Sequence, residues 1–341
     1  MIDASGGTEW ITSLKDRISA LTHTGDGVVA GTQAGDIVRI DASGNETWRH
    51  RCGFLPERTF WPWWFMRTPA IGALAMGHDQ REHRSIVAAG TGSTNLVFLD
   101  ACSGRILSDK LSPYGFPDRI KACYDGPDMD LGFLVGHSWL TSGSVVRRWT
   151  PPFDGTPNLK YFESVDAMGR TQDEWDTCGV VDFWQGVLAL RHSVNTLVLR
   201  HGAVNQLTLY ETDSGVPIWD AGIGGAPTAL TVVAGDDLIS TRIHVSEEFG
   251  WLVTFDGYGT RICGSRPLPD ILGMHLSSED RLLVWNDKAL LASKGEQEFS
   301  TFYHGGKALA WHESRLSSGL LCVRDRQLRL MAVNDEPGTP L

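Results

Sequence analysis

The sequence predicts an all-β protein built from one repeated unit, and two observations support that prediction. First, the segment Ile40–Trp48 (IDASGNETW) is almost repeated at Ile2–Trp10 (IDASGGTEW), a spacing of about forty residues, which is typical of repeat architectures. Second, short segments that alternate apolar and polar residues are bounded throughout by Gly, Asp and Ser, the pattern of strands joined by tight turns. The rest of the chain consists of weaker copies of the same unit.

The first complete copy contains four strands in order. We expect them at 18–23, 28–32, 36–41 and 46–50, with a turn of the form Asp-x-x-Gly before the last. The later copies cover the stretches 70–107, from 119 to 149, from 178 to 219, 227–263, 271–302 and 307–333.

The last copy lacks a fourth strand, because the chain continues from Val333 into a polar Pro- and Gly-containing tail. Residues 1–11 carry the missing piece, Thr8–Ile11, behind their own turn. We therefore expect the N-terminal strand to complete the last unit, which closes a circular array and removes its open edges. The alternative is that both ends are frayed tails.

One motif carries a resemblance to a known family. The stretch Val28–Thr32, followed by Gly35–Gly44 and Thr47-Trp48, resembles the blade repeat of quinoprotein-like (PQQ-repeat) β-propellers. The resemblance implies one propeller domain over 1–341, with four-stranded blades around a channel. Our count is seven blades, with six or eight as alternatives. The motif indicates fold and not activity, since propellers serve as scaffolds, lyases, hydrolases and dehydrogenases.

Composition excludes several partners and cofactors. A net charge of −11 opposes binding to nucleic acid. The six cysteines are scattered without a CxxC pair, which argues against zinc, and we expect no metal. The chain has no apolar run of about twenty residues, which a membrane helix needs, and no signal peptide at its start. We expect no membrane association and a cytoplasmic location. The quinone cofactor of exported dehydrogenases is not expected either, because the adjacent cysteine pair of those enzymes is absent.

Two long connections, 51–69 and 163–177, depart from a plain propeller. Both join one unit to the next, so both should lie on one face at the channel mouth, and loops of this length are usually functional or disordered. Large aromatic and arginine side chains dominate binding hot spots. The candidate binding residues are Trp61, Trp63, Trp64, Phe65, Arg67, Asp173 and Trp175. The alternative is that the aromatic loop folds over the channel as a plug.

Residues of the first strands are expected to line the channel at one level. The aligned set is Thr22, Ala75, Cys123, Asp182, Thr231, His275 and Trp311. Within it, Asp182 and His275 could act as general acid and base or could hold a divalent metal, which makes them the catalytic candidates if the protein is an enzyme. The alternative is that they are ordinary polar residues around buried water.

Two functions remain in competition. The first is a non-catalytic propeller scaffold that binds a protein or peptide through the aromatic loop and serves a bacterial-type enzyme or pathway. The second is a cytoplasmic lyase, cyclase or hydrolase that acts on a small molecule or peptide in the channel mouth.

Overall fold

In the computed structural model, strands account for almost all of the regular structure. The residues described are 8–24, 26–53, 69–112, 116–125, 130–138, 145–153, 161–163, 175–183, 186–193, 205–211, 216–276, 282–286, 289–293, 299–304, 307–313, 318–324 and 327–332. Within these ranges there are strands and one short 3-10 helix, η4 (Glu248–Gly250). None of the described segments is a helix with the length and hydropathy of a membrane span.

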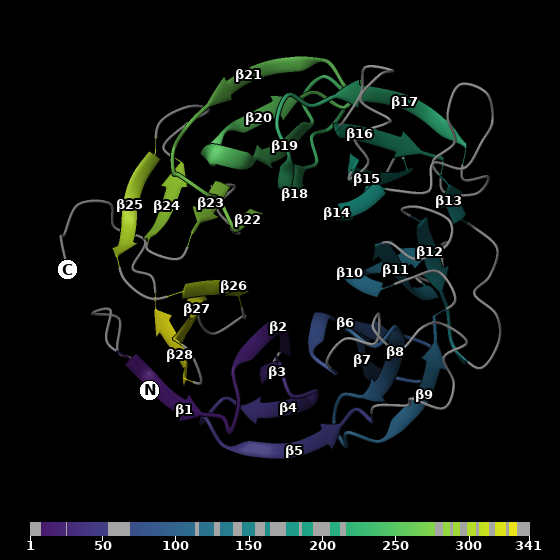
Figure 1. Cartoon of the computed structure of the whole chain (residues 1–341), viewed down its shortest axis with the longest axis vertical. Coiled ribbons are helices and arrows are strands. Elements are labelled where there is room, and N and C mark those ends of the chain that lie inside the picture. Colours follow the sequence, from purple (N-terminus) through teal and green to yellow (C-terminus); the bar gives the residue numbers. More distant parts are fainter. Residues whose placement is uncertain are drawn as a thin grey trace.

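The described strands form seven four-stranded antiparallel sheets arranged in a ring (Figure 1). The first three sheets consist of β2 (Ile18–Thr24), β3 (Gly27–Thr32), β4 (Asp36–Asp41), β5 (Glu46–Arg51); β6 (Ile71–Asp79), β7 (Arg84–Thr91), β8 (Asn95–Asp100), β9 (Ile106–Leu111); and β10 (Phe116–Asp125), β11 (Asp130–Ser138), β12 (Val145–Trp149), β13 (Tyr161–Glu163).

The remaining sheets follow the same order along the chain. They consist of β14 (Trp175–Phe183), β15 (Gly186–Ser193), β16 (Asn205–Tyr210), β17 (Pro217–Gly222); β18 (Pro227–Val233), β19 (Arg242–Glu247), β20 (Leu252–Phe255), β21 (Arg261–Ser265); β22 (Gly273–Leu276), β23 (Leu282–Trp285), β24 (Ala289–Ser293), β25 (Phe299–His304); and β26 (Lys307–Glu313), β27 (Ser318–Arg324), β28 (Gln327–Ala332), β1 (Thr8–Ser13).

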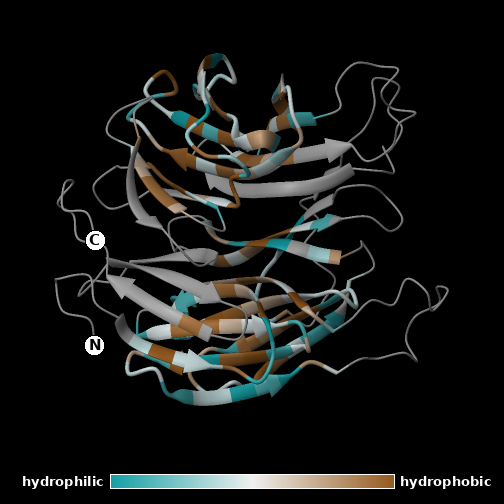
Figure 2. Cartoon of the chain, turned by 60° about the vertical axis from the view of Figure 1, so that its left-hand side comes forward, coloured by the Kyte–Doolittle hydropathy of each residue, from teal (hydrophilic) through white to brown (hydrophobic). Residues whose placement is uncertain are grey.

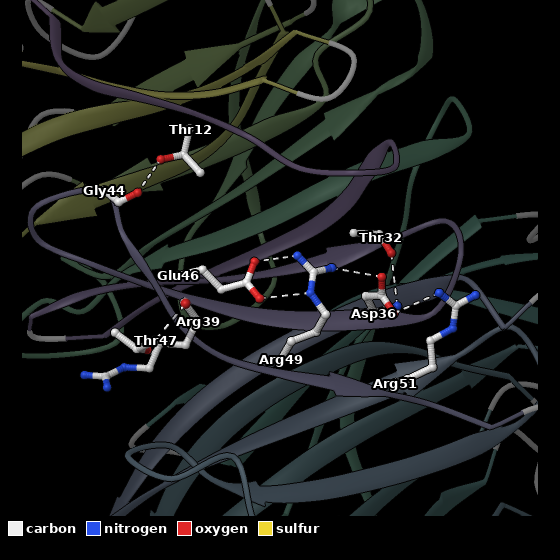
Figure 3. Close-up of polar contacts among 9 residues, drawn as sticks. All are labelled: Thr12, Thr32, Asp36, Arg39, Gly44, Glu46, Thr47, Arg49 and Arg51. Atoms are coloured by element: carbon white, nitrogen blue, oxygen red, sulfur yellow. Dashed lines mark hydrogen bonds and ion pairs between the residues drawn. The ribbon is translucent and has the colours of Figure 1, made fainter.

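The N-terminal strand closes the ring. Strand β1 pairs antiparallel with β28, from Thr8 opposite Met331 to Ser13 opposite Gln327. The Thr12 hydroxyl donates a hydrogen bond of 2.5 Å to the carbonyl oxygen of Gly44 in the first sheet (Figure 3). The last sheet is therefore completed by the chain start and is also fastened to its neighbour. The expected closing segment 1–11 thus corresponds to a strand at 8–13.

The first strand of every sheet is its innermost strand. The seven inner strands β2, β6, β10, β14, β18, β22 and β26 each contact the next one around the ring. The all-β prediction and the single-propeller prediction are confirmed by this arrangement. We counted seven units in the sequence, and the described strands form seven sheets.

The hydrophobic core is divided among the interfaces between neighbouring sheets. Between the first and second sheets, Val29 and Ile37 pack with Val87 and Leu99, all of them buried. Between the second and third sheets, Phe98 stacks on Phe153 with ring centroids 3.9 Å apart. A sheet that is covered on both faces needs apolar residues on both, which explains the continuous buried runs of β3 and β8.

The outer strand of the first sheet is polar and shields the sheet edge. Strand β5, the outermost strand at the bottom of Figures 1 and 2, is mainly hydrophilic. Its Arg49 guanidinium contacts Glu46 at 2.5 Å and the buried carboxylate of Asp36 at 2.9 Å, and Arg51 contacts Asp36 at 3.1 Å (Figure 3). The ion pairs hold the edge strand to β4, and the charges discourage pairing with another chain.

Candidate functional site

The repeated Asp-x-x-Gly turn fixes the last two strands of a unit. In the first sheet, Asp41 Oδ1 accepts the backbone N–H groups of Ser43 and Asn45, each at 2.9 Å. These hydrogen bonds favour the ionised carboxylate, with that from Asn45 the strongest, and hold the pKa of Asp41 below its usual value. Gly44 has a φ of 83°, a left-handed conformation in which glycine avoids the Cβ penalty.

The tryptophans that follow the turns of the first and fourth sheets pack on the turn of the next sheet. Trp48 Nε1 donates to the carbonyl of Ala101 at 2.9 Å, and Trp219 Nε1 donates to that of Gly257 at 3.1 Å. The Trp48 ring covers Gly104, where an added Cβ would lie 2.8 Å from the ring. These tryptophans are therefore packing residues between neighbouring sheets, and the turn and the tryptophan form the two sides of one contact.

The prediction that the aligned residues of the inner strands line the channel is wrong for two of them. Ala75 is buried in the core between the second and third sheets, and Cys123 in the core between the third and fourth. Successive side chains of a strand point to the two faces of its own sheet, and both faces here meet neighbouring sheets. Inner-strand residues therefore pack sideways. Thr22 and Thr231 are partly exposed.

The backbone places the two catalytic candidates on separate inner strands. Asp182 lies on β14 opposite Val187, and His275 lies on β22 opposite Leu283. Strand β18 lies between β14 and β22 in the ring. The Trp311 position is on β26, opposite Leu320.

Asp182 also lies far from the end of β14 where the preceding connection enters. It is the eighth residue of a strand that begins at Trp175, next to the β14–β15 hairpin turn. At about 3.3 Å per residue, roughly 23 Å separates it from that entry. The entry of a long connection and the candidate acid are therefore at opposite ends of the strand.

Most of the predicted binding residues lie outside the described residues. These are Trp61, Trp63, Trp64, Phe65, Arg67 and Asp173, and their placement on one face stays a prediction. Trp175 differs from the expectation: it begins β14, paired with Ser193, and Glu163 ends β13. The second long connection is therefore shorter than 163–177 at both ends, because each flanking sheet extends its pairing into it.

Sequence reasoning missed a group of exposed apolar residues on the fifth sheet. Phe249 and Trp251 are 62% and 45% exposed, and Leu272 is 48% exposed. Strand β20 begins at Leu252, so Trp251 lies in the connection before it. A signal was present in the sequence Glu247-Glu248-Phe249-Gly250-Trp251, where two acids and a glycine indicate a turn rather than a buried strand.

The fold and the contacts between neighbouring sheets define a single β-propeller. Among solved structures, the chain is similar to BamB from Moraxella catarrhalis, a PQQ-like β-propeller, with a TM-score of 0.59 over 95% of this chain and 86% of that one. The sequences are 14% identical, so the similarity concerns the fold. No family model matches the chain, and no curated protein matches it.

Proposed function

We propose that this protein is a non-catalytic scaffold that binds a protein or peptide. The observation that supports the proposal is the closed ring, in which β1 completes the last sheet and the sheets bury their faces against one another. Such a ring leaves its connections as the variable surface, and binding residues are disproportionately found on loops held by a rigid scaffold.

The finer part of the proposal assigns recognition to the aromatic connection 51–69, with Trp61, Trp63, Trp64, Phe65 and Arg67 as contact residues, joined by Asp173 and Trp175. Its support is composition, because tryptophan and arginine are enriched at binding hot spots. We place the interaction in the cytoplasm, with neither nucleic acid nor a membrane as partner.

The test is affinity capture from the native host with the wild-type chain and a Trp63→Ala/Trp64→Ala variant, followed by mass spectrometry. A matched control is Ile106→Ser, which removes a 46% exposed apolar side chain from the outer strand β9. One protein captured by the wild type and the control, and lost by the double variant of unchanged fold, supports the assignment. Equal capture by all three forms would show that the aromatic connection is not the binding site.

The enzymatic alternative makes a different prediction for the same molecule. It requires Asp182 and His275 to act together in the channel mouth, yet they lie on β14 and β22 with β18 between them. No observation favours it over the scaffold. A turnover assay that found a product, with loss of activity in a folded His275→Ala variant, would reverse this preference.

A further inference from the structure

Among the described residues, exposed large apolar side chains are concentrated on one part of the ring. The described residues include eleven of them, of which eight fall between residues 216 and 272: Val216, Ile218, Ile239, Phe249, Trp251, Tyr258, Ile262 and Leu272. Single exposed apolar residues are normal on a surface, but a group on neighbouring loops marks an interaction site. Phe249, Trp251 and Leu272 lie on two connections, one between β19 and β20 and one that leaves β21, and we call these three residues the fifth-sheet patch.

Phe249 and Trp251 lie at one end of the fifth sheet, and Leu272 lies where the chain enters the sixth sheet, its N–H donating to the carbonyl oxygen of Trp285 at 2.8 Å. Phe249 and Trp251 belong to the connection between β19 and β20, and Leu272 to the connection that leaves β21. The pairing of Leu252 with Ser265 puts the start of β20 beside the end of β21. Both connections therefore emerge on the face where the chain passes from one sheet to the next.

The two connections are packed against each other through their backbones. Arg266 Nε donates a hydrogen bond of 2.7 Å to the carbonyl oxygen of Phe249. Gly250 has a φ of 81°, and a Cβ added there would lie 1.6 Å from the carbonyl oxygen of Leu268. Only a glycine fits at this contact, so the shape of the turn is fixed by its neighbour.

A third connection, which enters β18, is attached from the other side. The backbone N–H groups of Gly224 and Gly225 donate to the carboxylate of Glu247 at 3.3 and 3.0 Å. The N–H of Glu248 donates to the carbonyl of Ala226 at 2.7 Å. Glu247 is buried, so these are charge-assisted hydrogen bonds shielded from water. Three connections thus form one preorganised support beneath the exposed rings.

Phe249 combines exposure with an unfavourable backbone conformation. Its φ and ψ are 61° and 13°, in the left-handed region where a Cβ is disfavoured. Its ring is 62% exposed, so folding recovers little apolar burial at this position. Backbone strain of this kind is found at ligand-contacting sites, where it is retained for function. Glycine would suit the turn better unless the ring itself is used.

The charges around the fifth-sheet patch indicate the chemistry of its partner. Glu248 and Asp270 are exposed on the same two connections, and the exposed Arg266 adds one positive charge, so the exposed charges of these connections are net negative. The whole chain has a net charge of −11. A second copy of the chain or an anionic membrane would therefore be repelled, whereas a basic segment would be attracted.

We propose that the fifth-sheet patch docks an extended segment of a partner protein that carries a large apolar side chain next to a lysine or arginine. The apolar side chain packs on Phe249, Trp251 and Leu272, and the basic residue faces Glu248 and Asp270. This site is separate from the 51–69 connection, but it rests on the proposed scaffold function, since it makes the ring a binder with a second recognition surface.

The test uses a phage-displayed library of random 12-residue peptides, selected on the immobilised full chain. Enriched peptides are synthesised and their affinity is measured by fluorescence anisotropy. We expect sequences that pair an aromatic or aliphatic residue with Lys or Arg. Phe249→Gly and Trp251→Ser should each weaken binding by about tenfold or more, as hot-spot truncations do. Glu248→Gln/Asp270→Asn should weaken binding and reduce its dependence on salt.

Two features keep the test decisive. Phe249→Gly removes the ring and relieves the left-handed conformation, so its thermal stability should equal or exceed that of the wild type. Ile239→Ser removes a 67% exposed side chain from the β18–β19 hairpin at the other end of the fifth sheet and should leave binding unchanged.

Three outcomes would overturn the proposal. The first is that no selected peptide depends on Phe249 or Trp251, and the second is that dependent peptides lack basic residues. The third is that sedimentation shows self-association, or binding to neutral phosphatidylcholine vesicles, that Phe249→Gly abolishes. The two tests can fail independently. If the Trp63→Ala/Trp64→Ala variant still captures the partner while peptides bind the fifth-sheet patch, only the role of the aromatic connection is rejected.

Discussion

The contact between Trp48 and Gly104 offers a direct test of how neighbouring sheets are joined. Gly104 has a φ of 71°, and a Cβ added to it would lie 2.8 Å from Cδ2 of the Trp48 ring. Gly104→Ala therefore imposes two separate costs. One is the left-handed backbone, and the other is the collision with a ring of the adjacent sheet.

The two costs can be separated by removing the ring. The left-handed conformation costs about 1–2 kcal/mol for a residue with a Cβ. Overpacking against a fixed ring adds about 1–3 kcal/mol. Gly104→Ala should thus destabilise the wild type by about 2–5 kcal/mol, but the Trp48→Ala variant by only about 1–2 kcal/mol. The coupling free energy of the cycle should be about 1–3 kcal/mol.

The free energies of unfolding are measured in urea by far-UV circular dichroism, with fluorescence used to check that the transitions coincide. Gly72→Ala is the matched control, because a Cβ there meets only the Gly90 carbonyl oxygen at 3.9 Å. It should change stability by about 0.5 kcal/mol at most. Equal costs of Gly104→Ala in both backgrounds would refute the reasoning, since the ring would then play no part.

Two further predictions concern pH and ring closure. Burial, with a smaller contribution from the charge of Arg242, lowers the pKa of His244 from 6.5 to about 4. As pH falls, His244 therefore binds a proton in the unfolded chain before it does so in the folded chain. The folded state should lose about 2 kcal/mol of stability between pH 7 and pH 5. In urea titrations at the two pH values, the His244→Gln variant should lack this loss of stability. A variant with the same pH dependence as the wild type would contradict the role given to His244. Deletion of residues 1–13 should leave β28 with an open edge and cause concentration-dependent self-association in sedimentation velocity. A synthetic peptide of residues 8–16 should reverse it, whereas a monomer of unchanged melting temperature would show that closure is dispensable.

Much of the fold was predictable because the residues that form the turns of each unit lie within the repeated motif itself. The sequence motif from Val28 to Trp48 specifies both turns: Thr32 Oγ1 accepts the N–H of Asp36 at 3.0 Å, and Asp41 organises the turn to Gly44. The equivalent hydrogen bond in the second sheet runs from the N–H of Asn95 to Oγ1 of Thr91, at 3.0 Å. Local hydrogen bonds of this kind act within five residues, so a local pattern reveals them.

The candidate site was less predictable, for reasons that lie outside any local pattern. The short strand β13 is formed only because β12 offers it an edge to pair with. Ala75 and Cys123 were assigned to the channel, whereas each is enclosed by the adjacent sheet. The turn that carries Phe249 and Trp251 is held by Leu268 and Ala226, which come from two other connections.

The sequence by itself determined the repeated unit, its strands, its turn residues and the closure by β1, because alternation and turn chemistry act over a few residues. Only the tertiary structure decided where side chains of the inner strands go, since that depends on the sheets that cover both faces. It also decided that Phe249 and Trp251 remain exposed. Three connections hold the backbone of this turn in place, and among the described residues the two side chains stay 62% and 45% exposed.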